Sequence, residues 1–378
     1  MAVDPEALEH LAADRSIVLV SGTNGKTTTT KLLAAALEGR PEVVTNVEGA
    51  NLPMGLVAAL AQGAPDSRAV LEVDEAWLPK VIPSVHPKAV ALLNLTRDQL
   101  DRNNEVRTLA ASWRSALAGQ AAGVVVANVD DPLVVWGAGA AARTIWVAAG
   151  QPWTDDSGGC PSCGGRIEFD AGGWSCGGCD FARPDADVEL DGDTLRCSDG
   201  RTVPIDLALP GRANRANAAM AIAVAVGLGG EPTDAACSMA QVAEIEGRYA
   251  WLDVGDSSAR LLLAKNPAGW LETLDILAAL PSPVVIVINA RLADGRDPSW
   301  LWDVPFERLR DRDVVASGER AWDLAVRLRY AGVPHRVIED PLVALYEAFD
   351  DVDFEVVANY TAFQAIRQKY GADVSRVT

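Results

Sequence analysis

Histidine is scarce in this chain of 378 residues, which contains only His10, His86 and His335. Imidazole is the side chain most often used as a general base or proton shuttle near neutral pH, so the sequence offers few candidates for either role. The scarcity of histidine therefore constrains the chemistry that this chain can perform.

Positive charge and long apolar runs are lacking too. The chain has 33 Lys and Arg residues against 52 Asp and Glu residues, which gives a formal net charge of −19. This balance argues against nucleic-acid partners, which need a basic surface, and against docking on an anionic membrane through a polybasic patch. No apolar run approaches the roughly 20 residues of a spanning helix, and the acidic segment 1–16 lacks the apolar core of a signal peptide. We therefore expect a cytoplasmic protein without a membrane-spanning segment.

Cysteine is too sparse for a disulfide framework in a cytosolic chain of this length, but four of the six cysteines cluster. Cys160 and Cys163 form one C-x-x-C knuckle, and Cys176 and Cys179 form a second one twelve residues later. Two such knuckles favour a closed tetrahedral structural Zn²⁺ site, with a redox pair or an iron–sulfur cluster as alternatives. Because this stretch contains one Arg and no Lys, we interpret it as a metal-stapled protrusion and not as a nucleic-acid reader.

Short β-rich runs alternate with helical stretches, a pattern typical of parallel sheets covered on both faces. The strands predicted first are Ser16–Val20, Ala69–Val73, Ala89–Leu93, Gly123–Asn128 and Thr144–Val147, with helices at Thr27–Leu37 and Asn214–Val226. Four more strands are predicted after Gly247 and Arg248, at Val284–Asn289, Asp313–Ala316, His335–Ile338 and Phe354–Ala358. The fold class is therefore α/β.

Helical periodicity disappears between residues 152 and 200, where Gly, Asp and Cys dominate. We interpret this stretch as a zinc-ribbon insert. The predicted organisation is a parallel-sheet domain at residues 1–248, which carries the insert at 152–200, followed by a smaller Rossmann-like α/β domain at residues 249–378.

The segment from Ser16 to Lys31 has the pattern of a strand, a glycine-containing turn and the start of a helix. Its two glycines allow backbone N–H groups to close around phosphate oxygens at a helix N-terminus. Lys26 can reach the β- and γ-phosphates of ATP, and the Thr27 hydroxyl can bind Mg²⁺. The turn reads G-T-N-G-K-T, a shorter form of the usual G-x-x-x-x-G-K-[ST] motif, and the alternative is an ordinary strand-to-helix turn. The residues predicted to bind nucleotide here are Gly22, Thr23, Asn24, Gly25, Lys26, Thr27 and Thr28.

This loop resembles the phosphate loop of the Mur ligases and folylpolyglutamate synthetases, and four further segments follow in that family's order. They are Leu71–Glu75, Asn94–Arg102, Ala127–Pro132 and Gly211–Ala219. The resemblance implies a Mur-type ATPase domain in which Glu72 and Thr27 bind Mg²⁺ and Asn217 contacts the nucleotide. It also implies that a carboxylate is activated as an acyl phosphate and then attacked by an amine. Taken singly, Glu72 could be a solvated strand end and Asn217 a helix cap.

Three features depart from the Mur ligases that add amino acids. The phosphate loop begins at residue 22 of this sequence, so we do not expect the N-terminal domain that holds a UDP-sugar precursor. Gln99 stands where those enzymes have histidine. The stretch Leu109–Ala118 offers Arg114 but no lysine for the family's carbamylated residue, so the usual second-metal arrangement is not predicted.

The cysteine insert and three segments of the last domain narrow the resemblance to the MurT ligase subunits of lipid II isoglutaminyl synthase. The three segments are Lys265–Trp270, Asn289–Asp303 and Asn359–Ala362. The resemblance implies a heterodimer with a glutaminase of the GatD type, which supplies ammonia for amidation of lipid II. The lone cysteines Cys197 and Cys237 have no convincing histidine companion, so no glutaminase activity is expected in this chain.

The resemblance also implies that an aspartate of the 294–303 segment enters the partner's active site. Asp297 is the best match, and Asp294 and Asp303 are the other candidates. The alternative for this segment is a solvated turn whose two tryptophans are held in the core. For the whole protein, the alternatives are a free-standing amino-acid ligase of the folylpolyglutamate kind and a non-catalytic nucleotide-binding scaffold subunit.

Overall fold

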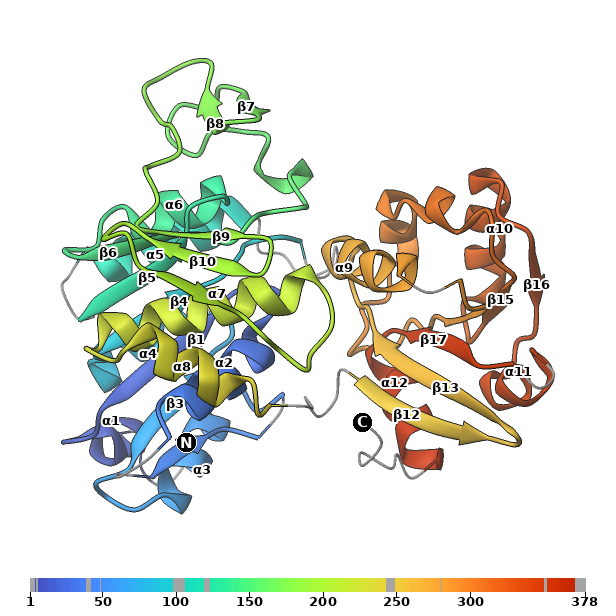
Figure 1. The fold of residues 1–378 in the computed structure, drawn as a ribbon, viewed down its shortest axis with the longest axis horizontal. Helices are drawn as coiled ribbons and strands as arrows, with labels where there is room; N and C mark the ends of the chain where they lie inside the picture. The colour runs from blue at the N-terminus through green and yellow to red at the C-terminus, as the bar shows by residue number, and fades with distance from the viewer. Residues whose placement is uncertain are drawn as a thin grey trace. The chain divides into compact units, whose positions relative to one another are not determined.

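The computed structural model describes residue 4 and residues 6–38, 42–47, 49–97, 106–118, 123–242, 249–279, 281–349 and 352–370. The described residues up to Val242 form one compact unit, and those from residue 249 on form a second (Figure 1). The boundary predicted at residue 248 lies outside the described residues.

The first unit is built on a nine-stranded sheet in the order β11-β10-β9-β6-β5-β4-β1-β3-β2. Every neighbouring pair from β2 to β9 is parallel, and the pairs β9–β10 and β10–β11 are antiparallel. The strands are β1 Ile17–Ser21, β2 Val43–Thr45, β3 Arg68–Glu72, β4 Ala89–Leu92, β5 Val124–Asn128, β6 Thr144–Ala148, β9 Val188–Asp191, β10 Thr194–Cys197 and β11 Thr202–Pro204.

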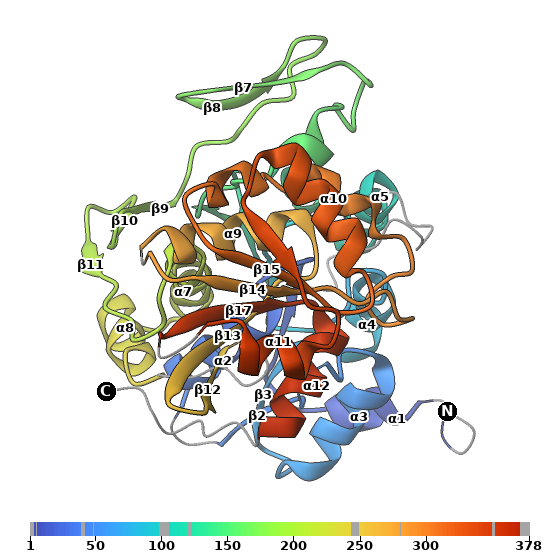
Figure 2. The same cartoon turned by 90° about the vertical axis from the view of Figure 1, so that its right-hand side faces the viewer.

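Helices cover both faces of this sheet (Figures 1 and 2). One face packs against α1 Ala7–Ala12, α3 Pro53–Gln62, α4 Leu78–Val85, α5 Val106–Leu117 and α6 Pro132–Ala138. The other side carries α2 Lys26–Ala36, α7 Arg212–Gly227 and α8 Pro232–Met239, which pack on one another. Because both faces are covered, the central strands are mainly apolar, and all five residues of β1 are buried.

The strand order brings the carboxyl ends of three central strands together. From β1 the chain runs out to β2, returns to β3 beside β1, and then crosses to β4 on the other side of β1. The carboxyl ends of β1, β3 and β4 are therefore neighbours, and in open α/β sheets ligands bind at such a point of reversal.

The region between β6 and α7 has two parts. The hairpin of β7 Ile167–Asp170 and β8 Gly173–Cys176 stands away from the main sheet (Figures 1 and 2), and η1 Asp155–Ser157 precedes it. The stretch 152–200 also contains β9 and β10, and β9 pairs in parallel with β6. Only part of the stretch interpreted as an insert is therefore separate from the main sheet.

The second unit is a six-stranded sheet in the order β12-β13-β17-β14-β15-β16, parallel except for the β12–β13 hairpin. Its strands are β12 Tyr249–Val254, β13 Ser257–Leu263, β14 Val284–Val287, β15 Val314–Ser317, β16 His335–Val337 and β17 Phe354–Ala358. Its helices are α9 Pro267–Ala278, η2 Pro298–Asp303, η3 Phe306–Leu309, α10 Ala321–Ala331, α11 Pro341–Glu347 and α12 Tyr360–Tyr370. Alternate residues of β14 point to two cores, one with α9 and α10 and one with α11 and α12.

The predicted α/β class with parallel sheets is confirmed. Predicted strands differ from the observed ones by at most two residues at either end, and β2, β12, β13 and the strands of the 152–204 region were not predicted. Among the described residues, no helix is both long enough and apolar enough to cross a membrane.

Candidate functional site

The loop between β1 and α2 has a backbone that only glycine adopts readily at two positions. Gly22 has φ +147° and Gly25 has φ +85°. A Cβ at Gly22 would lie 2.8 Å from Leu93 Cβ, and one at Gly25 would lie 2.4 Å from Asn217 Oδ1. Both glycines are therefore required by close approach as well as by conformation, and Asn217 on α7 lies directly against the loop.

The segment after β4 holds this loop from the other side. Asn94 Oδ1 accepts from the N–H of Asn24 at 2.9 Å, and Asn94 Nδ2 donates to Asn24 O at 3.0 Å. The Thr23 hydroxyl donates to Thr96 O and accepts from the N–H of Thr96, both at 3.0 Å. These reciprocal hydrogen bonds fix the conformation of the loop.

Two residues predicted to bind Mg²⁺ meet at the carboxyl ends of β1 and β3. The Thr27 hydroxyl donates to Glu72 Oε2 at 2.8 Å, and both residues are buried. Asn51 Nδ2 donates to Glu72 Oε1 at 3.3 Å, and Asn46 bonds both the N–H and the O of Glu72. The Glu72 carboxylate is therefore fixed by hydrogen bonds and is not a solvated strand end. A cation could bind the oxygen atoms of both Thr27 and Glu72.

Lys26 lies over the same edge. Its Nζ donates to the carbonyl of Gly22 at 2.5 Å, to the carbonyl of Thr23 at 3.3 Å and to Glu75 Oε2 at 3.0 Å. The structure thus brings together the predicted loop residues, Glu72 and Asn217, and it adds Glu75 to them.

Gln99 lies outside the described residues. Arg114, which stands where a carbamylated lysine was sought, donates to Trp136 O at 2.9 Å and its guanidinium lies 4.1 Å from the ring centroid of Trp136. The Arg114 guanidinium therefore links α5 to α6 through a hydrogen bond and a cation–π contact.

Asp131, in the segment Ala127–Pro132, links the chain after β4 to Gln151, just before the predicted insert. Its Oδ1 accepts from two N–H groups of α6, and its Oδ2 accepts from Leu95 N at 2.8 Å and Gln151 Nε2 at 2.9 Å. Burial raises the pKa of the Asp131 carboxyl to about 6, against the lowering effect of these bonds. Its role is structural.

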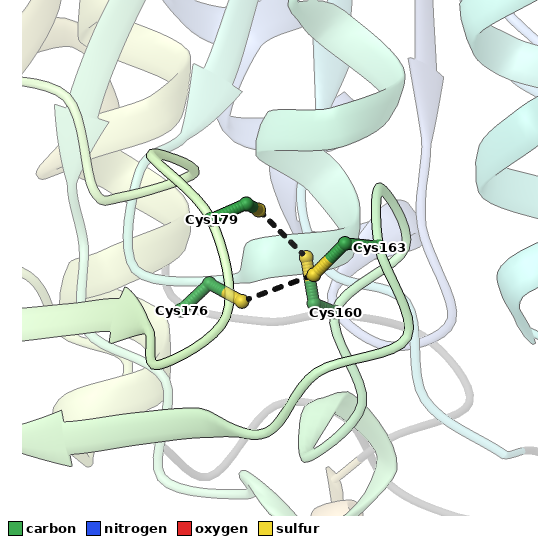
Figure 3. A group of neighbouring side chains, drawn as sticks. All are labelled: Cys160, Cys163, Cys176 and Cys179. Carbon is green, nitrogen blue, oxygen red and sulfur yellow. Dashed lines mark hydrogen bonds between the residues drawn. The ribbon is translucent and has the colours of Figure 1, made fainter.

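The four clustered cysteines converge on one point (Figure 3). All four Sγ atoms lie within 4.8 Å of one another, with Cys160 3.8 Å from Cys179 and Cys163 3.5 Å from Cys176. Four Zn–S bonds of about 2.3 Å in a tetrahedron give S–S edges of about 3.8 Å. The arrangement therefore fits a single zinc ion and not a pair of disulfides.

Hydrogen bonds shift the pKa values of two thiols of the cluster in opposite directions. Against the lowering effect of the backbone N–H of Phe181, the pKa of the Cys179 thiol is raised to about 12 by its cysteine neighbours and by burial. The N–H of Gly178 donates to Cys176 Sγ at 3.3 Å and, with Cys163, lowers the pKa of the Cys176 thiol to about 7. Trp174 Nε1 donates to Val129 O at 3.0 Å and Arg183 pairs with Asp130 at 2.8 Å, so the cysteine hairpin is attached to the end of β5.

The three candidate aspartates of the second unit have different environments. Asp294 is buried and accepts from the N–H and hydroxyl of Thr361 and the N–H of Arg291. Asp297 is exposed and caps η2, with Oδ1 accepting from the N–H of Ser299 at 2.9 Å. Asp303 is exposed at the end of η2. Both carboxylate oxygens of Asp294 thus accept hydrogen bonds within the second unit. Asp297 uses Oδ1 for its cap, and its Oδ2 can accept a hydrogen bond from a partner at the surface.

Sequence reasoning missed Glu75, Asn46 and Asn51. All three contact the predicted site residues, but the two asparagines lie in a turn-rich stretch where asparagine is common for local reasons. Glu75 was visible only as one of several acidic residues after β3.

Comparison with known proteins adds the family. A model described as Mur ligase middle domain matches residues 20–153, and one described as MurT ligase C-terminal matches residues 263–363. Among solved structures, a pseudomurein peptide ligase of type C from Methanothermus fervidus has a TM-score of 0.70 at 16% identity, over 94% of this chain and 78% of that one. MurF from Acinetobacter baumannii has a TM-score of 0.68 at 16% identity, over 98% and 79%. These structures share the fold.

Two curated relatives extend over nearly the whole chain. The lipid II isoglutaminyl synthase (glutamine-hydrolyzing) subunit MurT of Streptococcus pneumoniae is 30% identical, over 97% of this chain and 89% of the relative. The subunit of the same name from Staphylococcus aureus strain N315 is 31% identical, over 95% and 88%. The resemblance inferred from the motifs is confirmed: this chain belongs to the MurT family of the Mur ligases, which are ATP-dependent ligases.

Proposed function

We propose that this chain is the ligase subunit of a lipid II isoglutaminyl synthase. In this reaction the α-carboxylate of D-glutamate in lipid II attacks the γ-phosphorus of ATP, and ADP leaves. Ammonia then attacks the carbonyl carbon of the acyl phosphate. The attacking nitrogen loses a proton, inorganic phosphate leaves, and the amide remains on lipid II. Lipid II is embedded in the membrane and this chain is expected in the cytoplasm. The reaction would therefore take place at the inner, cytoplasmic face of the membrane.

The observation that carries this proposal is the convergence of Lys26, Thr27 and Glu72 at the carboxyl ends of β1 and β3. Lys26 would neutralise charge on the β- and γ-phosphates, and the loop N–H groups would hold the phosphate oxygens. Thr27 and Glu72 would hold Mg²⁺, which supplies further charge neutralisation at the transferring phosphoryl group. Asn217, which lies against Gly25, would contact the nucleotide.

The test is amidation by the purified chain with ATP, Mg²⁺ and ammonium, followed by mass spectrometry of lipid II. Conversion of a carboxylate to an amide lowers the mass of lipid II by about 1 Da, whereas addition of an amino acid raises it by that residue's mass. The second result would support a free-standing amino-acid ligase. ATP binding with no turnover in the presence of acceptor and partner would support a scaffold subunit.

We further propose that ammonia comes from a separate glutaminase of the GatD type in a heterodimer. Glutamine hydrolysis usually needs a cysteine with a histidine base. Cys237 lies on α8, whereas His10 and His86 lie at α1 and the end of α4 on the other face of the sheet, and His335 is in the second unit. This placement supports a division of the two reactions between two chains.

A row of exposed apolar side chains, three of them aromatic, lies on the second unit and is called the aromatic row here. It supports a role of the second unit in binding the glutaminase. Trp322, Val326 and Tyr330 share one exposed face of α10 at a spacing of four residues, and the Trp302 ring lies 5.4 Å from that of Tyr330. Trp302 is 53% exposed and Tyr330 is 75% exposed. Trp and Tyr are typical anchors of protein interfaces, and Trp302 belongs to the short helix that Asp297 caps.

Replacing Tyr330 with alanine is expected to weaken binding of the glutaminase about tenfold or more, since a hot-spot anchor typically contributes about 2 kcal/mol or more and about 1.4 kcal/mol is a factor of ten. Calorimetric titration of the two purified subunits measures this effect. Tyr346→Ala is the matched control, because Tyr346 is also an exposed tyrosine, 63% accessible, but on α11. Equal affinity of the Tyr330 variant and the wild-type chain would place the partner elsewhere.

The cysteine cluster is proposed to hold Zn²⁺ as a structural ion. Cys163→Ser is expected to reduce bound zinc from about one ion per chain to nearly none, because three thiolates no longer close the tetrahedron. The β7–β8 hairpin should then become sensitive to proteolysis, while ATP still binds, since the loop's partners lie outside the hairpin. Metal analysis and limited proteolysis measure both effects. Cys237→Ser, an exposed cysteine outside the cluster, is the control, and full zinc content after loss of two clustered cysteines would refute the site.

A further inference from the structure

Glu75 occupies a rigid position beside the phosphate loop. It lies in the turn between β3 and α4, where Asn51 O accepts from the N–H of Asp74 at 3.1 Å. On its other side, the indole N–H of the fully buried Trp113 donates to Glu75 O at 2.9 Å. Both bonds fix the backbone from which the Glu75 carboxylate extends.

The carboxylate is directed at the ammonium of Lys26. The Glu75 and Lys26 side chains are only 11% and 8% exposed, and Oε2 lies 3.0 Å from Nζ. An ammonium has three N–H donors, and among the described residues Nζ donates to Glu75, Gly22 O and Thr23 O. A buried charge requires such partners, so the pair explains how Lys26 lies within the loop.

The other two acidic residues of the segment 72–75, Glu72 and Asp74, have partners of their own. Glu72 bonds Thr27 and Asn51, and Asp74 Oδ1 accepts from the N–H of Ala76 at 3.0 Å within its own turn. Glu75 is therefore the carboxylate that neutralises Lys26 among the described residues.

A nucleotide phosphate that binds Lys26 must take over at least one of its three donors. The phosphate is anionic, as Glu75 is, so the two compete for one cation and repel each other when both are close. Competition with a neutral carbonyl lacks this repulsion. The contact most weakened by an incoming phosphate is thus the one to Glu75.

We propose that Glu75 is a positioning residue that sets nucleotide affinity. It holds Lys26 over the loop and competes with the β- and γ-phosphates for its ammonium, which keeps ATP and ADP from binding too tightly. This inference rests on the proposed role of the loop as the nucleotide site.

Glu75→Gln is the decisive variant, because it removes the charge and keeps the shape. Binding of ATP and of ADP to the full-length chain should become about tenfold tighter or more, since a unit charge within a few ångströms of the phosphates is lost. The KM for ATP should fall accordingly. A merely structural role would leave affinity unchanged or weaken it, so the direction of the change separates the two.

Asp74→Asn is the matched control and should leave the dissociation constants near wild type, since asparagine can make the same bond within its turn. Glu75→Asp retracts the charge by one methylene and should give an affinity between those of wild type and Glu75→Gln. If the glutamine variant does not fold, the aspartate variant decides alone. Unchanged or weaker nucleotide binding in the folded variant would overturn the inference, whereas a wild-type chain that binds no ATP would instead overturn the proposed function.

Discussion

Lys26→Ala is expected to abolish amidation of lipid II even when ammonium replaces glutamine as the nitrogen source. Phosphoryl transfer relies on neutralising charge at the γ-phosphate, and Lys26 is the ammonium that the structure directs at the loop. Removal of one such group typically costs about 10³-fold or more in rate. The loss should appear in the rate with saturating ATP as well as in ATP affinity. Because ammonium bypasses the glutaminase, the assay isolates the ligase step.

Lys31→Ala is the control, because Lys31 lies five residues further along the same helix and its loss changes the net charge equally. It should retain near-normal amidation. Binding of the glutaminase should be the same for both variants, since the loop belongs to the first unit and the aromatic row to the second. Near-normal amidation by the Lys26 variant with ammonium would remove the phosphate loop from the mechanism.

The glycine-containing loop between β1 and α2 was predictable because its signal is local. Two glycines, a lysine and a threonine within six residues follow a buried apolar strand, and the glycines are needed where the backbone has positive φ. The cysteine cluster was predictable for the same reason, since two C-x-x-C knuckles require no knowledge of the rest of the fold.

Glu75 was not predictable because its meaning depends on tertiary approach. It is 49 residues from Lys26 in the chain, and its carboxylate gains a role only when β3 pairs with β1. Nothing in the segment 72–75 distinguishes a glutamate that faces the loop from one that faces solvent.

The β12–β13 hairpin was missed although its pattern can be found in the sequence. Leu252 and Val254 are buried, the intervening Asp253 is not, and Gly255 has φ +62° at the turn. The strands β9 and β10 were missed because their polar, half-exposed residues resemble the loops around the cysteines. Composition therefore indicated a change of structure near residue 152 but not where the main sheet resumes.

The structure distinguishes Asp294 from Asp297 and Asp303 by burial. All three are aspartates within ten residues, and the sequence alone separates them only by resemblance. Burial and bonding separate them physically: Asp294 is bonded to Thr361 at the start of α12, whereas Asp297 lies exposed at the start of η2.

Asp297→Asn is expected to separate the two halves of the proposed reaction. If Asp297 orients the catalytic histidine of the glutaminase, glutamine-dependent amidation should fall by about 10⁴-fold, as in triads whose aspartate is replaced by asparagine. Ammonium-dependent amidation should stay near normal, because the phosphate loop is untouched. Asparagine caps helices about as well as aspartate, so η2 and the complex should persist.

The neighbouring aspartates make this test specific. Asp294→Asn should lower thermal stability and reduce both activities together, because the Asp294 carboxylate accepts three hydrogen bonds within the fold. Asp303→Asn, exposed at the other end of η2, should change neither activity by more than a few-fold. Glutamine hydrolysis and ammonium-driven amidation, measured side by side on the assembled complex, distinguish these patterns. Wild-type glutamine hydrolysis in all three variants would show that the 294–303 segment is structural and that the partner completes its active site without it.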